Sequence, residues 1–268
     1  MLSELEIGQF RAFGYVVLRS GLSPREVARL QEAHDRVIAD APVNNYFGGG
    51  AGTRTLAPFV EADNAFSELI EHPGVMEAMR DIWGTECLYN GGSDMWSNLD
   101  DTPWHSDGDP GREVLTLKTA FYLDEQDASQ GALNVIPGSH HPEFCAAVFR
   151  SCGYWDEGRP RLRLDPHSVP GAVSLQTRPG DVVLWDNRLW HSAFRRGDGR
   201  PRRTMFIGYT PDPLDDLLEI SALRATVRAH LNEEQPLVYS REMMLKGGQA
   251  RETMAERLEA LGVANVRE

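Results

Sequence analysis

The stretch PGDVVLWDNRLWHSAF, residues 179–194, shows the clearest β-strand pattern of the chain. It reads as a Pro-Gly turn, a short apolar strand, a second turn, and a histidine entering another strand. Similar short runs, rich in β-branched and aromatic residues, lie on both sides of it between Leu88 and Tyr209. They are MWSN (95–98), VLTLKTAFYL (114–123), ALNVI (132–136), AVSLQT (172–177) and RTMFIGY (203–209). Several short strands at close spacing predict a sandwich or barrel.

Helical patterns flank this β-rich core. Ser23-Pro24-Arg25-Glu26 predicts a helix start with Ser23 as the cap, and the helix should run to about Asp40 with His34 packed on its apolar stripe. We expect a single domain over residues 1–268, with a mostly helical region at 1–87, the β core at 88–211 and a helical extension at 212–268.

Composition excludes several classes of function. A net charge of −13 and a pI near 5.1 disfavour a nucleic-acid binder, which needs clustered basic residues. No run of about 18 apolar residues predicts a membrane span, and the N-terminus lacks a basic start followed by an apolar stretch, so we expect a cytoplasmic protein. Three scattered cysteines without a CxxC predict neither a disulfide framework nor a thiolate zinc site. Small-molecule chemistry remains.

A candidate metal site begins at the segment TPWHSD, residues 102–107. His105 and Asp107 are two residues apart, so in extended backbone both side chains leave the same face and can meet one ion. His191, in the stretch 179–194, is the expected third ligand. Two imidazoles and one carboxylate leave three octahedral positions open for a chelating cosubstrate and O2, as in non-haem Fe(II) oxygenases, whereas zinc prefers four-coordinate closure.

A cluster of arginines follows His191. We interpret Arg195, Arg196 and Arg200 as members of a solvated basic turn. Arg202 or Arg203, at the entry to the next strand, instead fits a planar fork that binds a carboxylate with two parallel hydrogen bonds.

The segments WHSD, ALNVIPGSHH, GDVVLW, WHS and RPRRTMFIGY occur in this order from about Ser93 to Pro211. Together they resemble the phytanoyl-CoA dioxygenase (PhyH) family of Fe(II)- and 2-oxoglutarate-dependent oxygenases. The resemblance implies a double-stranded β-helix, the jelly roll or cupin-like core, with Fe(II) bound by His105, Asp107 and His191. It also implies an arginine about eleven residues beyond the last histidine that binds the far carboxylate of 2-oxoglutarate, which is Arg202, with Arg203 in reserve.

Two further residues are candidates for contacts near the iron. Strand alternation in VLTLKTAFYLD (114–124) turns Thr116, Lys118, Ala120 and Tyr122 into the barrel, so Lys118 either meets an anionic group of substrate or cosubstrate or reaches out to solvent. Asn98 resembles a position that contacts 2-oxoglutarate in relatives.

The resemblance implies a dioxygenase that uses Fe(II), 2-oxoglutarate and O2 and releases succinate and CO2. We expect hydroxylation, ring closure or desaturation of a polar small molecule in secondary metabolism. Halogenation is disfavoured, because family halogenases carry a small residue where this chain has Asp107. An insertion at about 142–170 should form the substrate lid, with Tyr154, Trp155, Arg161 and Arg163 as recognition candidates. The alternatives are a cupin-like isomerase or hydrolase using Zn or Mn, or a metal-containing binding module.

Overall fold

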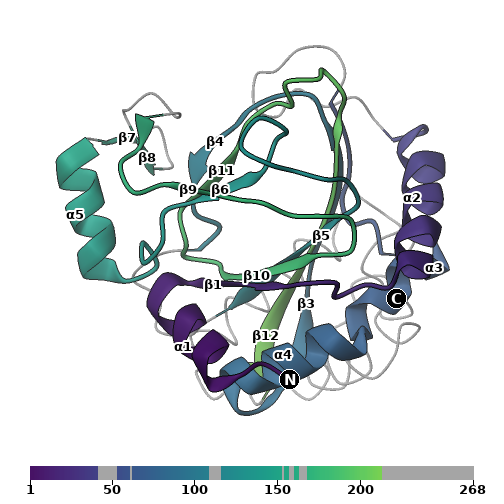
Figure 1. Ribbon diagram of the computed structural model, residues 1–268, viewed down its shortest axis with the longest axis horizontal. Helices are drawn as coiled ribbons and strands as arrows, with labels where there is room; N and C mark the ends of the chain where they lie inside the picture. The colour runs from purple at the N-terminus through teal and green to yellow at the C-terminus, as the bar shows by residue number, and fades with distance from the viewer. Residues whose placement is uncertain are drawn as a thin grey trace, which may run out of the picture.

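Two facing antiparallel sheets form the core of the molecule (Figure 1). The computed structural model describes residues 1–41, 53–60, 62–108, 116–152, 154–156, 160–162 and 168–212. The larger sheet has six strands, in the spatial order β1 (Tyr15–Leu18), β10 (Val182–Asp186), β5 (Leu117–Tyr122), β12 (Arg202–Asp212), β3 (Glu86–Asn98) and β2 (Arg54–Leu56). The smaller sheet has four, in the order β4 (Thr102–His105), β11 (His191–Ala193), β6 (Leu133–Val135) and β9 (Val173–Leu175).

Side-chain alternation divides the six-stranded sheet into two faces. On β5, Leu117 and Phe121 belong to the core beneath the helices, whereas Ala120 and Tyr122 pack between the sheets. Val135 and other side chains of the four-stranded sheet complete that inner core. The predicted inward face of β5 is therefore confirmed, and the architecture is the expected jelly roll.

Helices cover the outer face of the six-stranded sheet (Figure 1). They are α1 (Glu4–Phe13), α2 (Pro24–Ile38), α3 (Asn64–Ser67), the 3-10 helix η1 (Glu68–Glu71) and α4 (Pro73–Trp83). The predicted start of α2 is confirmed, since Ser23 accepts the Glu26 backbone N–H and the Glu26 carboxylate accepts the Ser23 backbone N–H. Tyr209 on β12 ties sheet to helix by donating its hydroxyl to the Ile70 carbonyl, 2.9 Å away.

The N-terminal region contributes strands as well as helices. β1 pairs with β10 at one edge of the six-stranded sheet, and β2 pairs with β3 at the other. The sequence did not predict these strands, because they are only four and three residues long and their pairing partners lie far along the chain. The expected division at residue 87 therefore does not separate helices from sheet.

The region expected to be a lid contains α5 (Pro142–Cys152) and the hairpin of β7 (Tyr154–Asp156) and β8 (Pro160–Leu162), beside the four-stranded sheet (Figure 1). The side chains of Tyr154, Trp155, Arg161 and Arg163, and the expected C-terminal helices after residue 212, lie outside what the structure describes. Cys87 and Cys145 are buried, and each has its sulfur as a thiol. None of the helices in the described part of the chain combines the length and apolar character that crossing a bilayer needs.

Candidate active site

Pairing of β4 with β11 brings the three candidate metal ligands together. His105, the last residue of β4, lies directly opposite His191, the first residue of β11, and their ring centroids are 4.3 Å apart. Asp107 follows two residues after His105. The ligand atoms of His105, Asp107 and His191 all lie within 4.8 Å of one another, so one ion can contact all three.

Each imidazole is oriented by the backbone carbonyl of the residue two positions before it in the chain. The Nδ1–H of His105 donates to the Pro103 carbonyl at 2.8 Å, and that of His191 donates to the Leu189 carbonyl at 2.9 Å. A donated proton on Nδ1 leaves the lone pair on Nε2, the tautomer that a metal ligand needs. The two Nε2 atoms face Asp107, at 3.8 Å from its Oδ1 for His105 and 3.6 Å from its Oδ2 for His191.

The electrostatics of the site favour metal-binding protonation states. Burial and the neighbouring His105 lower the pKa of His191 to about 3, so its imidazole is neutral at physiological pH. Burial alone would raise the pKa of Asp107, but the attraction of Lys118 and the two histidines outweighs it and keeps that pKa below its usual range. Two imidazoles and one carboxylate are a donor set that suits Fe(II), and the residues present therefore fit the metal that the resemblance implies.

Lys118 lies beside the three candidate metal ligands, on the side of the six-stranded sheet that faces the four-stranded sheet. Its Nζ is 3.4 Å from Asp107 Oδ2 and 3.5 Å from Asp94 Oδ1, and it stands over the Phe206 ring at 5.1 Å from the centroid. Burial opposes the charged form of Lys118, but the attraction of the two carboxylates outweighs it and raises its pKa. Lys118 therefore points inward, as strand alternation predicts, and the anionic groups that it contacts belong to the protein. Asp94 and Phe206 were not predicted, although both occupy inward positions of their strands.

Arg202 lies at the start of β12, directly opposite Asn98 on β3. Its side chain is almost fully buried, with 2% of the residue exposed, and it donates to the carbonyls of Phe194 at 2.6 Å and Asp100 at 2.8 Å. Burial lowers its pKa to about 10, which still leaves the guanidinium charged at neutral pH. Within the described part of the chain it forms no ion pair with a carboxylate.

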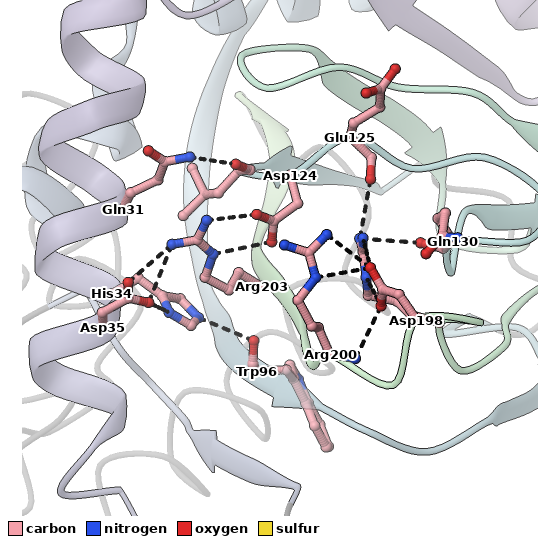
Figure 2. Close-up of polar contacts among 12 residues, drawn as sticks. Gln31, His34, Asp35, Trp96, Asp124, Glu125, Gln130, Asp198, Arg200 and Arg203 are labelled. Atoms are coloured by element: carbon pink, nitrogen blue, oxygen red, sulfur yellow. Dashed lines mark hydrogen bonds and ion pairs between the residues drawn. The ribbon is translucent and has the colours of Figure 1, made fainter.

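Arg203 points to the opposite face of the sheet. Figure 2 shows its guanidinium between Asp35 of α2 and Asp124, which follows β5, with Nη2 2.6 Å from Asp124 Oδ1 and Nη1 3.1 Å from Asp35 Oδ2. The two carboxylates that neutralise Arg203 thus belong to the protein itself. The structure separates the two arginines that the sequence left as alternatives.

Arg196 departs from the expected solvated turn. It is buried, forms an ion pair with Asp198 at 2.8 Å and donates to the Glu125 carbonyl at 3.1 Å, so it anchors the loop before β12 to the loop after β5. Arg195 and Arg200 are exposed, in agreement with the expectation.

Asn98 is fixed by its neighbours. Its Oδ1 accepts the Asp100 backbone N–H at 2.7 Å and lies 3.1 Å from the Thr53 hydroxyl, which is nearer to Asp100 Oδ2 at 2.6 Å. Its Nδ2 makes a long contact of 3.4 Å with Thr102 Oγ1. The amide therefore orders the segment whose Asp100 carbonyl receives Arg202. The position of Thr53 beside Asn98 could not be predicted from the sequence, because it depends on the packing of segments that are distant in the chain.

The jelly roll brings together two histidines and one carboxylate, and it buries an arginine at the start of β12. This combination is that of the non-haem iron, 2-oxoglutarate-dependent dioxygenases. The family model for phytanoyl-CoA dioxygenase (PhyH) matches residues 10–204, and the chain belongs to that family.

Relatives agree with this assignment. An ectoine dioxygenase from Sphingopyxis alaskensis is 25% identical over 242 residues, which cover 78% of this chain and 76% of that protein. Among solved structures, the epimerase SnoN in complex with Fe3+, alpha ketoglutarate and nogalamycin RO matches with a TM-score of 0.63 at 20% identity, covering 78% of this chain and 83% of SnoN. The alpha ketoglutarate-dependent carbocyclase SnoK from nogalamycin biosynthesis matches with a TM-score of 0.61 at 22% identity, covering 78% and 84%. At these identities the two structures show the shared fold.

Proposed function

We propose that His105, Asp107 and His191 hold Fe(II), that Arg202 anchors the far carboxylate of 2-oxoglutarate, and that the enzyme hydroxylates or oxidatively cyclises a polar small molecule. Bound iron, with 2-oxoglutarate and O2, would supply the oxidising power and release succinate and CO2. The chain supplies ligand orientation, cosubstrate placement and a shielded chamber.

The observation that carries this proposal is the buried charge of Arg202. A buried cation is costly unless a counter-ion neutralises it, and the contacts that the described part of the chain offers Arg202 are two carbonyls, which carry only partial charges. A carboxylate that accepts two parallel hydrogen bonds from the remaining N–H groups would neutralise it. A dicarboxylic cosubstrate can place one carboxylate at Arg202 and its other end at the metal.

Asn98 is placed to assist. It lies opposite Arg202 on the adjacent strand, and cross-strand partners project from the same face of a sheet. Its Oδ1 is held by Thr53 and Asp100, which turns the Nδ2 donor to the remaining side. We assign Asn98 Nδ2 a hydrogen bond to the same carboxylate, and we assign no cosubstrate contact to Arg203, whose fork is engaged by Asp35 and Asp124.

The substrate is proposed in outline. The inner face carries polar side chains near the metal, Lys118 and Asp94 among them, which favours a polar molecule over a long acyl chain. An ectoine dioxygenase and two enzymes of nogalamycin biosynthesis share the fold, which supports a role in secondary metabolism. We place the enzyme in the cytoplasm. The non-oxidative alternatives, a cupin-like isomerase or hydrolase or a binding module, predict no succinate.

The test is succinate formation by protein loaded anaerobically with Fe(II) and exposed to O2 with 2-oxoglutarate and a panel of polar substrates. We expect His105→Ala and Arg202→Met to abolish succinate formation, and Arg203→Met, the matched control on the adjacent residue, to retain it. Absence of turnover together with absence of 2-oxoglutarate binding by the wild type would favour a non-oxidative metalloprotein. Loss of 2-oxoglutarate binding in Arg203→Met alone would move the anchor to Arg203.

A further inference from the structure

Lys118 reaches the metal site by crossing a neighbouring strand. On β5 it lies opposite Trp185 of β10 on one side and Gly208 of β12 on the other. Gly208 has no side chain, so the lysine can extend across β12 and over the ring of Phe206. Its ammonium thereby lies between the carboxylates of Asp107 and Asp94, and Asp94 is on β3, on the far side of β12.

The position of this ammonium is fixed by groups that do not bind metal. Asp94 accepts the Trp96 indole N–H on Oδ2 at 2.6 Å and faces Lys118 with Oδ1. The cation also lies over the Phe206 ring, 5.1 Å from its centroid, which is the geometry of a cation–π contact. Lys118 is therefore held in place whether or not Asp107 has a second partner.

The two oxygens of Asp107 have different neighbours. Oδ1 is 3.8 Å from Nε2 of His105. Oδ2 is 3.6 Å from Nε2 of His191 and 3.4 Å from Nζ of Lys118. Among the described residues, Lys118 is the lysine or arginine that contacts this carboxylate, and it does so at Oδ2.

We propose that Lys118 is a positioning residue that holds Asp107 Oδ2 and so leaves this carboxylate a single oxygen with which to bind the metal. This inference rests on the proposed function. A carboxylate that binds through both oxygens takes two of six positions and leaves two beside the histidines, whereas binding through one leaves three. A chelating 2-oxoglutarate and O2 together need three, so Lys118 preserves the vacancy that the reaction requires.

The test compares Lys118→Met, which removes the cation at similar length, with the matched control Lys118→Arg, which keeps a cation, and with Asp94→Asn, which keeps the lysine but removes one of the groups that fix it. Each protein is loaded with Co(II) without O2, and three quantities are measured: the metal dissociation constant, the visible absorption spectrum of the ion, and the dissociation constant of 2-oxoglutarate from the metal-loaded protein. Lys118→Gln serves in place of the methionine variant if that variant does not fold.

We expect Lys118→Met to bind Co(II) as tightly as the wild type or more tightly, because a nearby positive charge is lost and an oxygen ligand is freed. Its Co(II) spectrum should differ from that of the wild type before 2-oxoglutarate is added, and its 2-oxoglutarate affinity should fall about tenfold. Lys118→Arg should keep the wild-type spectrum and the affinity for 2-oxoglutarate. Asp94→Asn should change the spectrum in the same direction as Lys118→Met but by less, because the lysine keeps its charge and its contact with the Phe206 ring while it loses one of the groups that fix it.

Weaker Co(II) binding by Lys118→Met with an unchanged spectrum would overturn the inference, because it would mean that the lysine only supports the local fold. An unchanged spectrum with unchanged affinities would overturn it as well. A wild-type protein that binds Co(II) but no 2-oxoglutarate would instead contradict the proposed function, so the two failures are distinguishable.

Discussion

Arg202 and Arg203 are consecutive on β12 and their guanidinium groups lie on opposite sides of the six-stranded sheet. Arg202 is enclosed between the sheets with two backbone carbonyls, and Arg203 joins the sheet to α2 through Asp124 and Asp35. Adjacent side chains of a strand necessarily diverge in this way. One arginine thereby points toward the four-stranded sheet, whereas the other joins the six-stranded sheet to α2.

Replacement of the outer arginine should affect stability and not ligand binding. We expect Arg203→Met to lower the free energy of unfolding by about 1 kcal/mol, since the ion pairs that it loses are partly exposed. The affinity for 2-oxoglutarate should remain within about twofold of the wild type. Urea unfolding and anaerobic ligand titration measure the two effects, and a large loss of affinity with unchanged stability would contradict the division of roles.

Gly131 is a sensitive position for the inner arginine. Its φ of +79° favours glycine, and an added Cβ would collide with Cδ of Arg202. Gly171 has a similar φ of +76° with open space around it, so Gly171→Ala has only the backbone cost, about 1 kcal/mol. We expect Gly131→Ala to show that cost and, in addition, to weaken 2-oxoglutarate binding by about tenfold or more. Equal affinities in the two variants would argue against Arg202 as the anchor.

His34 should make the stability depend on pH. Burial lowers the pKa of this imidazole below its ordinary value of 6.5, against the opposing effects of the Trp96 carbonyl and Asp35, while Arg203 adds to the lowering. The unfolded chain therefore binds a proton more readily than the folded chain. The stability contributed by neutral His34 is fully present above pH 6.5 and is lost as the pH falls below it, by up to about 1.4 kcal/mol per pH unit, until the folded-state pKa is reached.

The measurement is urea unfolding of the wild type and of His34→Gln at several pH values between 7.5 and 5, a range chosen to span the ordinary imidazole pKa of about 6.5. The difference in unfolding free energy between the two proteins should shrink as the pH falls. A difference that stays constant across this range would show that His34 has the same pKa in both states.

Removal of metal should destabilise the protein through the three ligands. An ion present at about 100 times its dissociation constant adds about 2.7 kcal/mol to the stability. A chelator should therefore lower the Tm of Fe(II)-loaded wild type by roughly 5–10 °C. The Tm of His105→Ala should not respond to the chelator, and an equal response in that variant would place the ion elsewhere.

The sequence predicted the elements that depend on local pattern. The strand before His191, the inward face of β5 and the capped start of α2 follow from turn residues, alternation and a capping box, all of which span a few residues. The convergence of His105 and His191 was predictable for a related reason: both stand at strand ends in a fold with few ways to pair strands.

Features that depend on strand register were not predictable. Which of Arg202 and Arg203 points toward the four-stranded sheet would reverse with a register shift of one residue, and the observed register pairs Arg202 with Asn98. The contact between Lys118 and Asp94 spans an intervening strand, and the burial of Arg196 depends on a loop distant in the chain. No local pattern records such relationships.

The direct opposition of His105 and His191 also has a consequence for the order in which the protein is made. His105 and Asp107 leave the ribosome well before His191, and the site is complete only when β11 has been synthesised and paired with β4. A nascent chain that ends before β11 offers at most two of the three ligands. With the proposed ligand set, iron would bind late in biosynthesis, after β11 has paired with β4.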